Sequence, residues 1–204
     1  MSAPESYRPV PASREAGAAA GVSLASVRVD LIELAALRGR AGELAEVTAA
    51  RGIVLPRFGR VAAADEGLIL SVRPERWWLL SQPGVAGARA AAWQARCAGC
   101  AAGIDLSAAW EVLHLGGTAS REALRRGCRL DLHPDRFSSG HAAASVVAQV
   151  PVVIVALRTS LLLITPATTA RHFREWIAAA AQPFGFQAHT QALESLPSQE
   201  SPSP

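Results

Sequence analysis

Two of the three cysteines, Cys97 and Cys100, stand in a Cys-x-x-Cys spacing, which a thiol redox pair or half of a zinc site would use. A redox pair needs its first thiol at a helix N-terminus, where the helix dipole lowers the thiol pKa. Cys97 instead ends an alanine-rich stretch that predicts a helix. A zinc site needs about four ligands, and no second such pair follows. We interpret both residues as small buried cysteines and predict no metal site, with redox chemistry left as the alternative.

The third cysteine, Cys128, precedes His133 by five residues, so the two could serve as a nucleophile and its base. Cys128 follows Gly127 among leucines, which is typical of a buried position. His133 comes directly before Pro134, where an imidazole suits a hydrogen-bonding role in a tight turn. The structural interpretation is favoured, and no catalytic residue is assigned.

A glycine pair, Gly116-Gly117, follows the predicted strand Trp110–Leu115 and precedes the predicted helix Ser120–Arg126, as a phosphate-binding loop would. It lacks the G-x-G-x-x-G pattern, and the chain contains no lysine for a Walker motif. Asp105 and Glu111 flank the strand without forming an acid–base pair, and a turn or cap role is expected for Asp105. No cofactor-binding residue is predicted on this chain.

Two adjacent tryptophans, Trp77 and Trp78, fall in a predicted strand. Neighbouring side chains of a strand point to opposite faces, so one ring is expected to fill the core. The outward ring is the candidate anchor of a protein interface, because tryptophan is enriched at interface centres. The alternative is that both faces of this strand are buried within the chain itself.

The charge pattern does not predict nucleic-acid binding. All 20 basic residues are arginine, the net charge is +3, and the arginines are scattered without interleaved aromatic residues. One group, Arg121, Arg125 and Arg129, has the i, i+4 spacing of a single helix face and is interpreted as a solvated surface. No partner nucleic acid is expected.

The most apolar stretch, Ala142–Ala167, is too interrupted by polar residues and a proline for a membrane helix, which needs about 20 apolar residues. It predicts three strands instead, one ending at Val150, then Val152–Leu157 and Leu161–Thr165. Their near-continuous apolar character predicts burial on both faces of a sheet. No membrane span and no secretory leader are predicted, and the chain is expected to be cytoplasmic.

Helical and strand-like patterns alternate along the rest of the chain. A strand-like section covers 27–37, and a hairpin is predicted from 68–72 and 77–81. Helices are predicted at 42–51, 85–97 and 168–181. Because short turns join many of the strands, we predict an α+β fold of antiparallel sheets with helices packed on one face. The two halves are loosely repeated β-α-β-like units.

The predicted domain organisation places a flexible segment at residues 1–25, one α+β domain at 26–186 and a disordered polar tail at 187–204. The two end segments are rich in proline, serine and other small or polar residues, which cannot bury enough apolar surface to offset the entropy of ordering.

The segment 105–137 resembles the signature region of the gamma subunit of heterotetrameric sarcosine oxidase. The residues that carry the resemblance are Gly127, Cys128, Leu130, Asp131, Leu132, His133 and Pro134. A second block, 68–80, resembles a strand–Pro–Glu–x–Trp–Leu element of folate-dependent aminomethyltransferases. Together the resemblance covers roughly residues 25 to 186. It implies a fold like the N-terminal part of an aminomethyltransferase.

The resemblance also implies a function. It predicts a non-catalytic assembly subunit with alpha, beta and delta partner subunits, in a complex that oxidises sarcosine to glycine. FAD, FMN, NAD and tetrahydrofolate are then expected on the partner subunits, and zinc on the delta subunit. The alternative is a stand-alone folate-binding protein that transfers one-carbon units, as aminomethyltransferases do.

Overall fold

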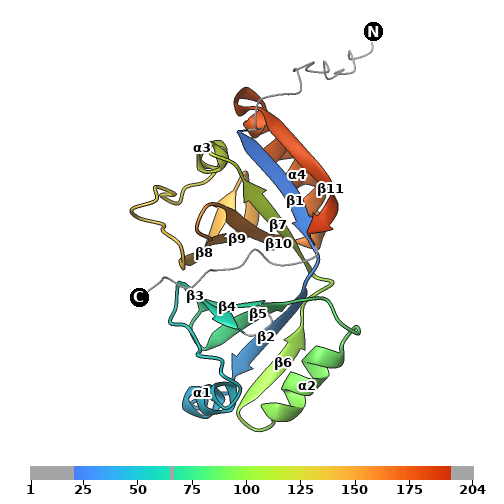
Figure 1. Ribbon diagram of the computed structural model, residues 1–204. Helices are drawn as coiled ribbons and strands as arrows, with labels where there is room; N and C mark the ends of the chain where they lie inside the picture. Colours follow the sequence, from blue (N-terminus) through green and yellow to red (C-terminus); the bar gives the residue numbers. More distant parts are fainter. Residues whose placement is uncertain (1–20, 65–66, 194–204) are drawn as a thin grey trace, which may run out of the picture.

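The computed structural model describes residues 21–64 and 67–193, which form two facing sheets with helices on their outer sides (Figure 1). The smaller sheet has the strand order β3-β4-β5-β2-β6, and its neighbouring strands are antiparallel. Its strands are β2 Asp30–Ala36, β3 Arg60–Ala64, β4 Gly67–Arg73, β5 Arg76–Ser81 and β6 Ala101–Asp105.

The larger sheet has six strands in the order β11-β1-β7-β10-β9-β8. All its pairs are antiparallel except β1 with β11, which run parallel. Its strands are β1 Val22–Val27, β7 Trp110–Gly116, β8 Ala142–Val147, β9 Val150–Ala156, β10 Leu161–Pro166 and β11 Phe186–Leu193.

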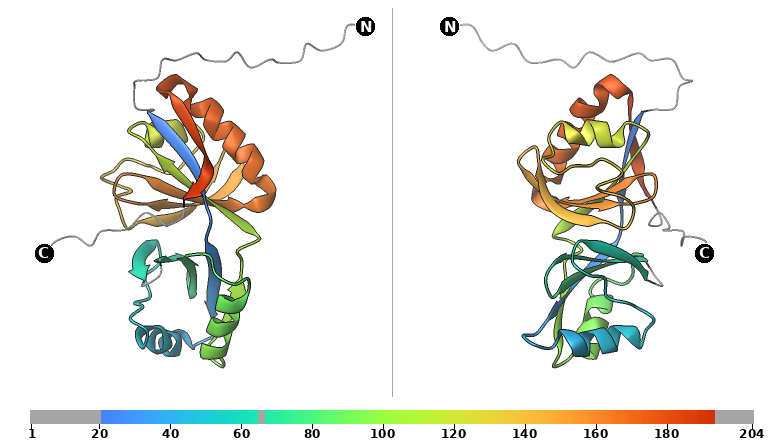
Figure 2. Two further views of the ribbon diagram at one scale, coloured as in Figure 1. Left: turned by 45° about the vertical axis from the view of Figure 1, so that its right-hand side comes forward. Right: turned by 90° about the vertical axis from the view of Figure 1, so that its left-hand side faces the viewer.

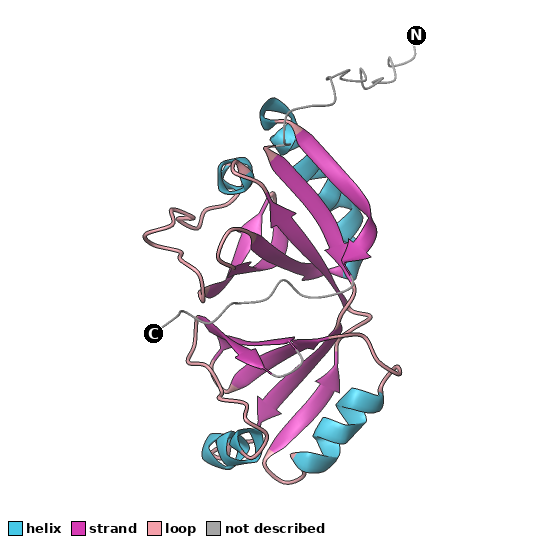
Figure 3. Cartoon of the chain, viewed as in Figure 1, coloured by secondary structure: helices cyan, strands magenta, loops and turns pink. Residues whose placement is uncertain are grey.

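Among residues 21–64 and 67–193, four α-helices cover the outer faces of the two sheets (Figure 3). The helices α1 and α2 pack on the five-stranded sheet, and α3 and α4 pack on the six-stranded sheet. Their bounds are α1 Ala41–Ala49, α2 Ala88–Arg96, α3 Ser120–Arg125 and α4 Ala167–Ala181, and a short 3₁₀ turn, η1, covers Gln182–Phe184. The predicted α+β architecture with helices on one face of each sheet is confirmed.

The loose internal repeat is also confirmed, and it covers all the strands and α-helices from β2 to β11. Each half reads β-α-β-β-β-α-β, first from β2 to β6 and then from β7 to β11. Corresponding strands occupy corresponding places in the two sheets, with β1 inserted between β7 and β11. The chain therefore crosses between the sheets twice, after β1 and after β6 (Figure 2).

Strict alternation of side chains builds three hydrophobic layers. Along β10, Leu162 and Ile164 point into the core between the two sheets, while Leu161 and Leu163 point toward α4. Along β2, Leu31 joins the core between the sheets and Ile32 joins the core under α1 and α2. Each sheet is covered on both faces, which explains the near-continuous apolar strands.

The predicted domain boundaries need correction at both ends. β1 begins at Val22, inside the segment 1–25 that we predicted to be flexible. β11 occupies residues 186–193, where a disordered tail was predicted from 187. Strand β11 forms by pairing with β1 at the edge of the sheet, where a strand needs little apolar pattern of its own. Residues 1–20 and 194–204 lie outside the described part.

The strand-like section 27–37 is also divided. Val27 ends β1 in one sheet, and β2 begins at Asp30 in the other, so residues 28–29 cross between the sheets. β3 and β6 were not predicted, because short alanine- and glycine-rich strands carry no clear alternation. The 68–72/77–81 hairpin is confirmed as β4 and β5. Within the described residues, no helix is long and apolar enough to cross a membrane.

Candidate functional site

The signature segment begins where α3 ends, and a close backbone approach explains its glycine. A Cβ atom added at Gly127 would stand 2.4 Å from Cζ2 of Trp176 on α4 and 3.2 Å from the backbone nitrogen of Ala148. The backbone N–H of Ala148 also donates to the Gly127 carbonyl at 3.1 Å. Gly127 therefore lets α3 approach α4 and the β8–β9 turn.

Cys128 and His133 contact different partner residues. Cys128 forms an isolated β-bridge with Val147, and its Sγ lies 3.8 Å from Oγ of Ser145. The backbone N–H of His133 donates to Oδ1 of Asp131, and its Nδ1 lies 3.5 Å from Oδ2 of Asp135. These contacts favour the structural interpretation of both residues over a nucleophile–base pair.

The rest of the signature fastens the loop between α3 and β8. Leu132 is buried in the core under α3 and α4, and Leu130 packs against it. Nη1 of Arg121 donates to the carbonyls of Leu132 and Phe137 at 2.7 and 2.9 Å. Burial lowers the pKa of Arg121. The interpretation of Arg121 as part of a solvated helix face is therefore wrong, because its guanidinium satisfies loop carbonyls.

Both tryptophans of the predicted interface are buried within the chain, so the surface-anchor prediction is wrong and the alternative holds. Trp77 is 9% exposed and lies under α1 and α2, where its Nε1 donates to the Pro56 carbonyl at 2.9 Å. Trp78 is 6% exposed and lies between the two sheets. The reason is that β5 is covered on both faces, as the sequence alone could not show.

Trp78 also reveals a buried polar group that the sequence analysis missed. Its Nε1 donates to Oε2 of Glu33 at 2.9 Å, and the other carboxylate oxygen of Glu33 is paired with Arg76. The centre of the Trp78 ring lies 4.8 Å from the centre of the Trp110 ring. The only sequence signal was a glutamate at a core-facing position of an apolar strand.

The Cys97–Cys100 pair lies at the C-terminal end of α2, as predicted, and both thiols are buried. Burial raises the pKa of Cys97 to about 11, and Cys100 beside it acts in the same direction. A thiol this difficult to ionise is a poor nucleophile at neutral pH. Within the described residues, no group of three or more His, Cys, Asp or Glu is placed to hold a metal ion.

A pH prediction follows for Cys97. Its folded-state pKa is raised, so its contribution to stability is present below the ordinary thiol pKa and is lost as the pH rises toward 11. We expect up to about 3 kcal/mol of alkaline destabilisation from this group, and a flatter profile for Cys97→Ala, in urea unfolding series from pH 8 to 11. Rapid iodoacetamide labelling of Cys97 in the native chain at pH 8 would contradict this expectation.

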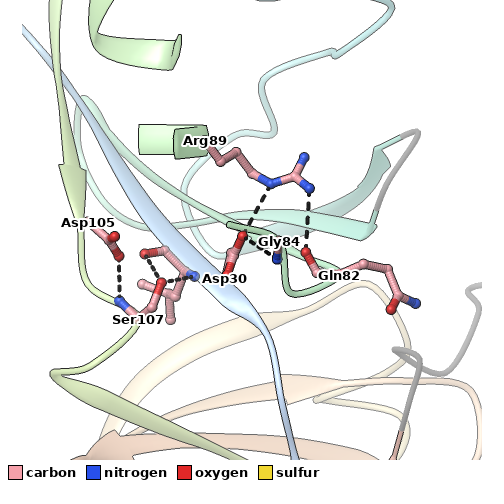
Figure 4. A network of polar contacts seen from close by, with 7 residues as sticks. Asp30, Gln82, Gly84, Arg89, Asp105 and Ser107 are labelled. Atoms are coloured by element: carbon pink, nitrogen blue, oxygen red, sulfur yellow. Dashed lines mark hydrogen bonds and ion pairs between the residues drawn. The ribbon is translucent and has the colours of Figure 1, made fainter. Parts of the chain in front are cut away.

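A polar network ties together the two places where the chain crosses between sheets (Figure 4). Oδ2 of Asp30 accepts from the backbone N–H of Gly84 at 3.0 Å and lies 3.5 Å from Nε of Arg89. Beside it, Oγ of Ser107 accepts from the Leu31 backbone N–H at 3.0 Å. The network joins the start of β2 to the turn after β6.

The two acidic residues Asp105, at the end of β6, and Glu111, in β7, have separate structural partners. Oδ1 of Asp105 accepts from the backbone N–H of Ser107 at 2.9 Å, which confirms its turn role, and hydrogen bonds from Ser107 lower the pKa of Asp105. Oε1 of Glu111 binds Nη1 of Arg174 at 2.6 Å and the hydroxyl of Ser26 at 3.0 Å. Glu111 thus fastens α4 to β7.

Two histidines share one row of the six-stranded sheet. His114 on β7 and His189 on β11 both pair in register with Ala25 of the intervening β1. Burial lowers the pKa of His114, and the neighbouring His189 lowers it further. His114 therefore favours its neutral form in the fold. Neither histidine carried a signal in the sequence.

Comparison with known proteins places these features in a family context. Residues 38–182 match the model of the sarcosine oxidase gamma subunit family. The chain is 37% identical over 123 residues to a sarcosine oxidase subunit gamma of an Arthrobacter species, a match that covers 58% of this chain and 59% of that protein. It is 32% identical over 148 residues to the subunit gamma of Corynebacterium sp. strain P-1, covering 70% and 71%.

Two solved structures share the fold. A chain of the heterotetrameric sarcosine oxidase from Corynebacterium sp. U-96, in complex with pyrrole 2-carboxylate, superposes with a TM-score of 0.71 at 28% identity, covering 80% of this chain and 85% of that one. The glycine cleavage system aminomethyltransferase T from Bartonella henselae gives a TM-score of 0.63 at 16% identity, covering 83% and 48%. The second likeness confirms the predicted aminomethyltransferase-like fold.

Proposed function

The chain belongs to the sarcosine oxidase gamma subunit family, and from this premise we propose that it is a non-catalytic subunit that supports assembly of a heterotetrameric, flavin-dependent sarcosine oxidase. The observation that carries the proposal is the likeness to a chain of a heterotetrameric sarcosine oxidase over 80% of this chain. The partners are then alpha, beta and delta subunits, in the cytoplasm.

In this proposal the whole complex oxidises sarcosine to glycine, reduces oxygen to hydrogen peroxide and transfers the one-carbon unit to tetrahydrofolate. FAD, FMN, NAD and tetrahydrofolate belong to partner subunits, and zinc to the delta subunit. The structural roles of Cys128, His133 and Cys97 support the non-catalytic part of the proposal, because Cys128 and His133 take part in a bridge and a turn and Cys97 is buried.

The loop between α1 and β3 is the surface that we propose for subunit contact. It exposes two large apolar side chains, Val54 at 72% and Phe58 at 66%. The loop is held in place, because the Pro56 carbonyl accepts from Trp77 and the Gly59 carbonyl accepts from the Ala142 N–H at 2.9 Å. Two large exposed apolar side chains on one anchored loop support this assignment, because apolar side chains that gather on a surface mark interaction sites.

The loop also lies where the edges of the two sheets meet. β3 and β8 are edge strands of their sheets. Arg60, the first residue of β3, forms an antiparallel β-bridge with His141, the residue just before β8. A partner bound here would therefore contact both sheets, which would couple assembly to the relative placement of the two halves.

Purification of the affinity-tagged full chain from its native host tests the proposed function. We expect co-eluting larger subunits, a flavin absorbance spectrum and sarcosine-dependent peroxide formation. A colourless chain that elutes alone, without any partner, would overturn the proposal and bring the folate-binding alternative forward.

A substitution tests the proposed contact loop. Phe58→Asp is expected to reduce partner recovery at least tenfold, because a carboxylate would be buried against an apolar partner surface. The melting temperature of the isolated chain should change little, since the Phe58 side chain is exposed. Val85→Asp changes a comparably exposed residue in the loop before α2 and serves as the matched control. Equal loss of partners in both variants would contradict the loop assignment.

A further inference from the structure

A cavity opens on the outer side of the five-stranded sheet, next to α2 and the loop that follows α1. Its volume is about 390 Å³, at the lower end of the range for small-molecule sites. Its apolar lining includes Ile53, Leu79 and Trp93, all of them buried core residues. These side chains belong to the apolar part of the cavity lining.

The cavity also contains a buried hydroxyl without a partner. Ser81 at the end of β5 is 1% exposed, and among the described residues its Oγ makes no hydrogen bond. Because Leu80 faces the core between the sheets, the Ser81 side chain points to the opposite, cavity-lining side. Buried hydroxyls in native proteins almost always have a partner, so this group points to a ligand.

The charged lining of the cavity is mainly cationic. Three arginines, Arg51, Arg89 and Arg96, and one aspartate, Asp30, line it, which leaves an excess of two positive charges. Arg89 is fixed by its contacts with Asp30 and with the Gln82 carbonyl. The guanidinium of Arg96 lies 5.6 Å from the centre of the Trp93 ring, over the apolar wall.

The first turn of α2 adds to this positive field. Ala88, its first residue, lines the cavity, and the N-terminal cap residue, Gly87, provides no side-chain hydrogen bond. No acidic residue lies in this first turn. The first turn of α2 therefore places partial positive charge beside Ala88, whereas Arg96, in the last turn, provides a full positive charge at the opposite end of the helix.

We propose that this cavity binds a small aromatic carboxylate. The carboxylate pairs with the guanidinium groups of Arg51 and Arg96, whose planar forks match its two oxygens. The ring lies against Trp93, and the Ser81 hydroxyl binds a polar substituent of the ring. The apolar side chains of Ile53, Leu79 and Trp93 and the presence of Asp30 favour a singly charged carboxylate over phosphate. This binding site stands independently of the assembly role.

Titration of the full chain with 4-hydroxybenzoate, followed by isothermal calorimetry as the readout, tests the site. We expect saturable binding with a Kd below about 1 mM, weakened about tenfold or more in Arg51→Gln and in Arg96→Gln. Arg125→Gln removes an exposed arginine on α3 and is the matched control, with unchanged binding expected. The uncharged analogue 4-hydroxybenzamide should bind at least tenfold more weakly than the acid.

Ser81→Ala measures the contribution of the Ser81 hydroxyl to ligand affinity separately from that of the arginines. It is expected to weaken 4-hydroxybenzoate binding several-fold without lowering the melting temperature, because the hydroxyl has no partner to lose in the free chain. Three results would overturn the proposal: no saturation at about 10 mM probe, equal affinity for the benzamide, or tighter binding of inorganic phosphate. Unchanged affinity in both arginine variants would overturn it as well.

Discussion

Trp78→Ala should lower the free energy of unfolding by about 5 kcal/mol, the largest effect we expect from a single substitution in this chain. The ring is buried between the two sheets, so its removal leaves a cavity where both halves of the molecule meet. It also removes the indole N–H that donates a hydrogen bond to the buried Glu33 carboxylate. Chemical denaturation of the isolated chain measures the loss.

Two milder variants divide this effect into its parts. Trp78→Phe keeps most of the ring volume but removes the donor to Glu33, and about 1–3 kcal/mol of destabilisation is expected. Trp77→Phe makes the same change of ring size and removes a hydrogen bond to the neutral Pro56 carbonyl, so it should cost less and serves as the matched control. A double-mutant cycle of Trp78→Phe with Glu33→Gln should show coupling.

The same experiments distinguish folding from assembly. A surface anchor would lose partner subunits on truncation while the isolated chain kept its melting temperature. Because Trp78 is buried within the chain, we expect the melting temperature of Trp78→Ala to fall first, with any loss of partners as its consequence. An unchanged melting temperature with lost assembly would restore the anchor interpretation.

Gly127→Ala should destabilise the fold by about 2–3 kcal/mol, although it adds only one methyl group. The new Cβ would stand 2.4 Å from the Trp176 ring, and the backbone nitrogen of Ala148 at 3.2 Å limits escape on the other side. Trp176 is stacked on Phe173 with ring centres 6.3 Å apart, so its displacement disturbs the packing of α4. Thermal unfolding of the isolated chain provides the measurement.

Two controls make this prediction specific. Gly42→Ala changes a glycine inside α1 with open space around it and should be neutral or slightly stabilising, because alanine favours helix. In a Trp176→Ala background, Gly127→Ala should cost much less, since the clashing ring is gone. An equal cost in both backgrounds would show that the Trp176 contact is not the reason for the glycine.

Several features of the fold were predictable because their causes are local. The β4–β5 hairpin follows from two apolar runs joined by a short turn, and α4 follows from the spacing of Phe173, Trp176 and Ile177. The position of Cys97 at the end of α2 was also visible, and with it the unfavourable dipole for a thiolate. These inferences needed only residues within one or two turns of each other.

The candidate sites depended on residues that are far apart in the chain. Glu33 meets Trp78 across 45 positions, and Asp30 meets Arg89 across 59. Ser81 gave no signal at all, since a serine at the end of a strand is ordinary until its neighbours are known. Strand register and helix packing determine which distant residues form such pairs. Neither can be read directly from a single sequence.

The sequence by itself determined the near-continuous apolar runs of β9 and β10, and therefore that these two strands were buried on both faces. Only the tertiary structure decided what covers each face: a second sheet on one side and helices on the other. It also decided that residues 186–193 form a strand beside β1. The physical reason is that periodicity is a local property, whereas burial depends on which distant element packs against a surface.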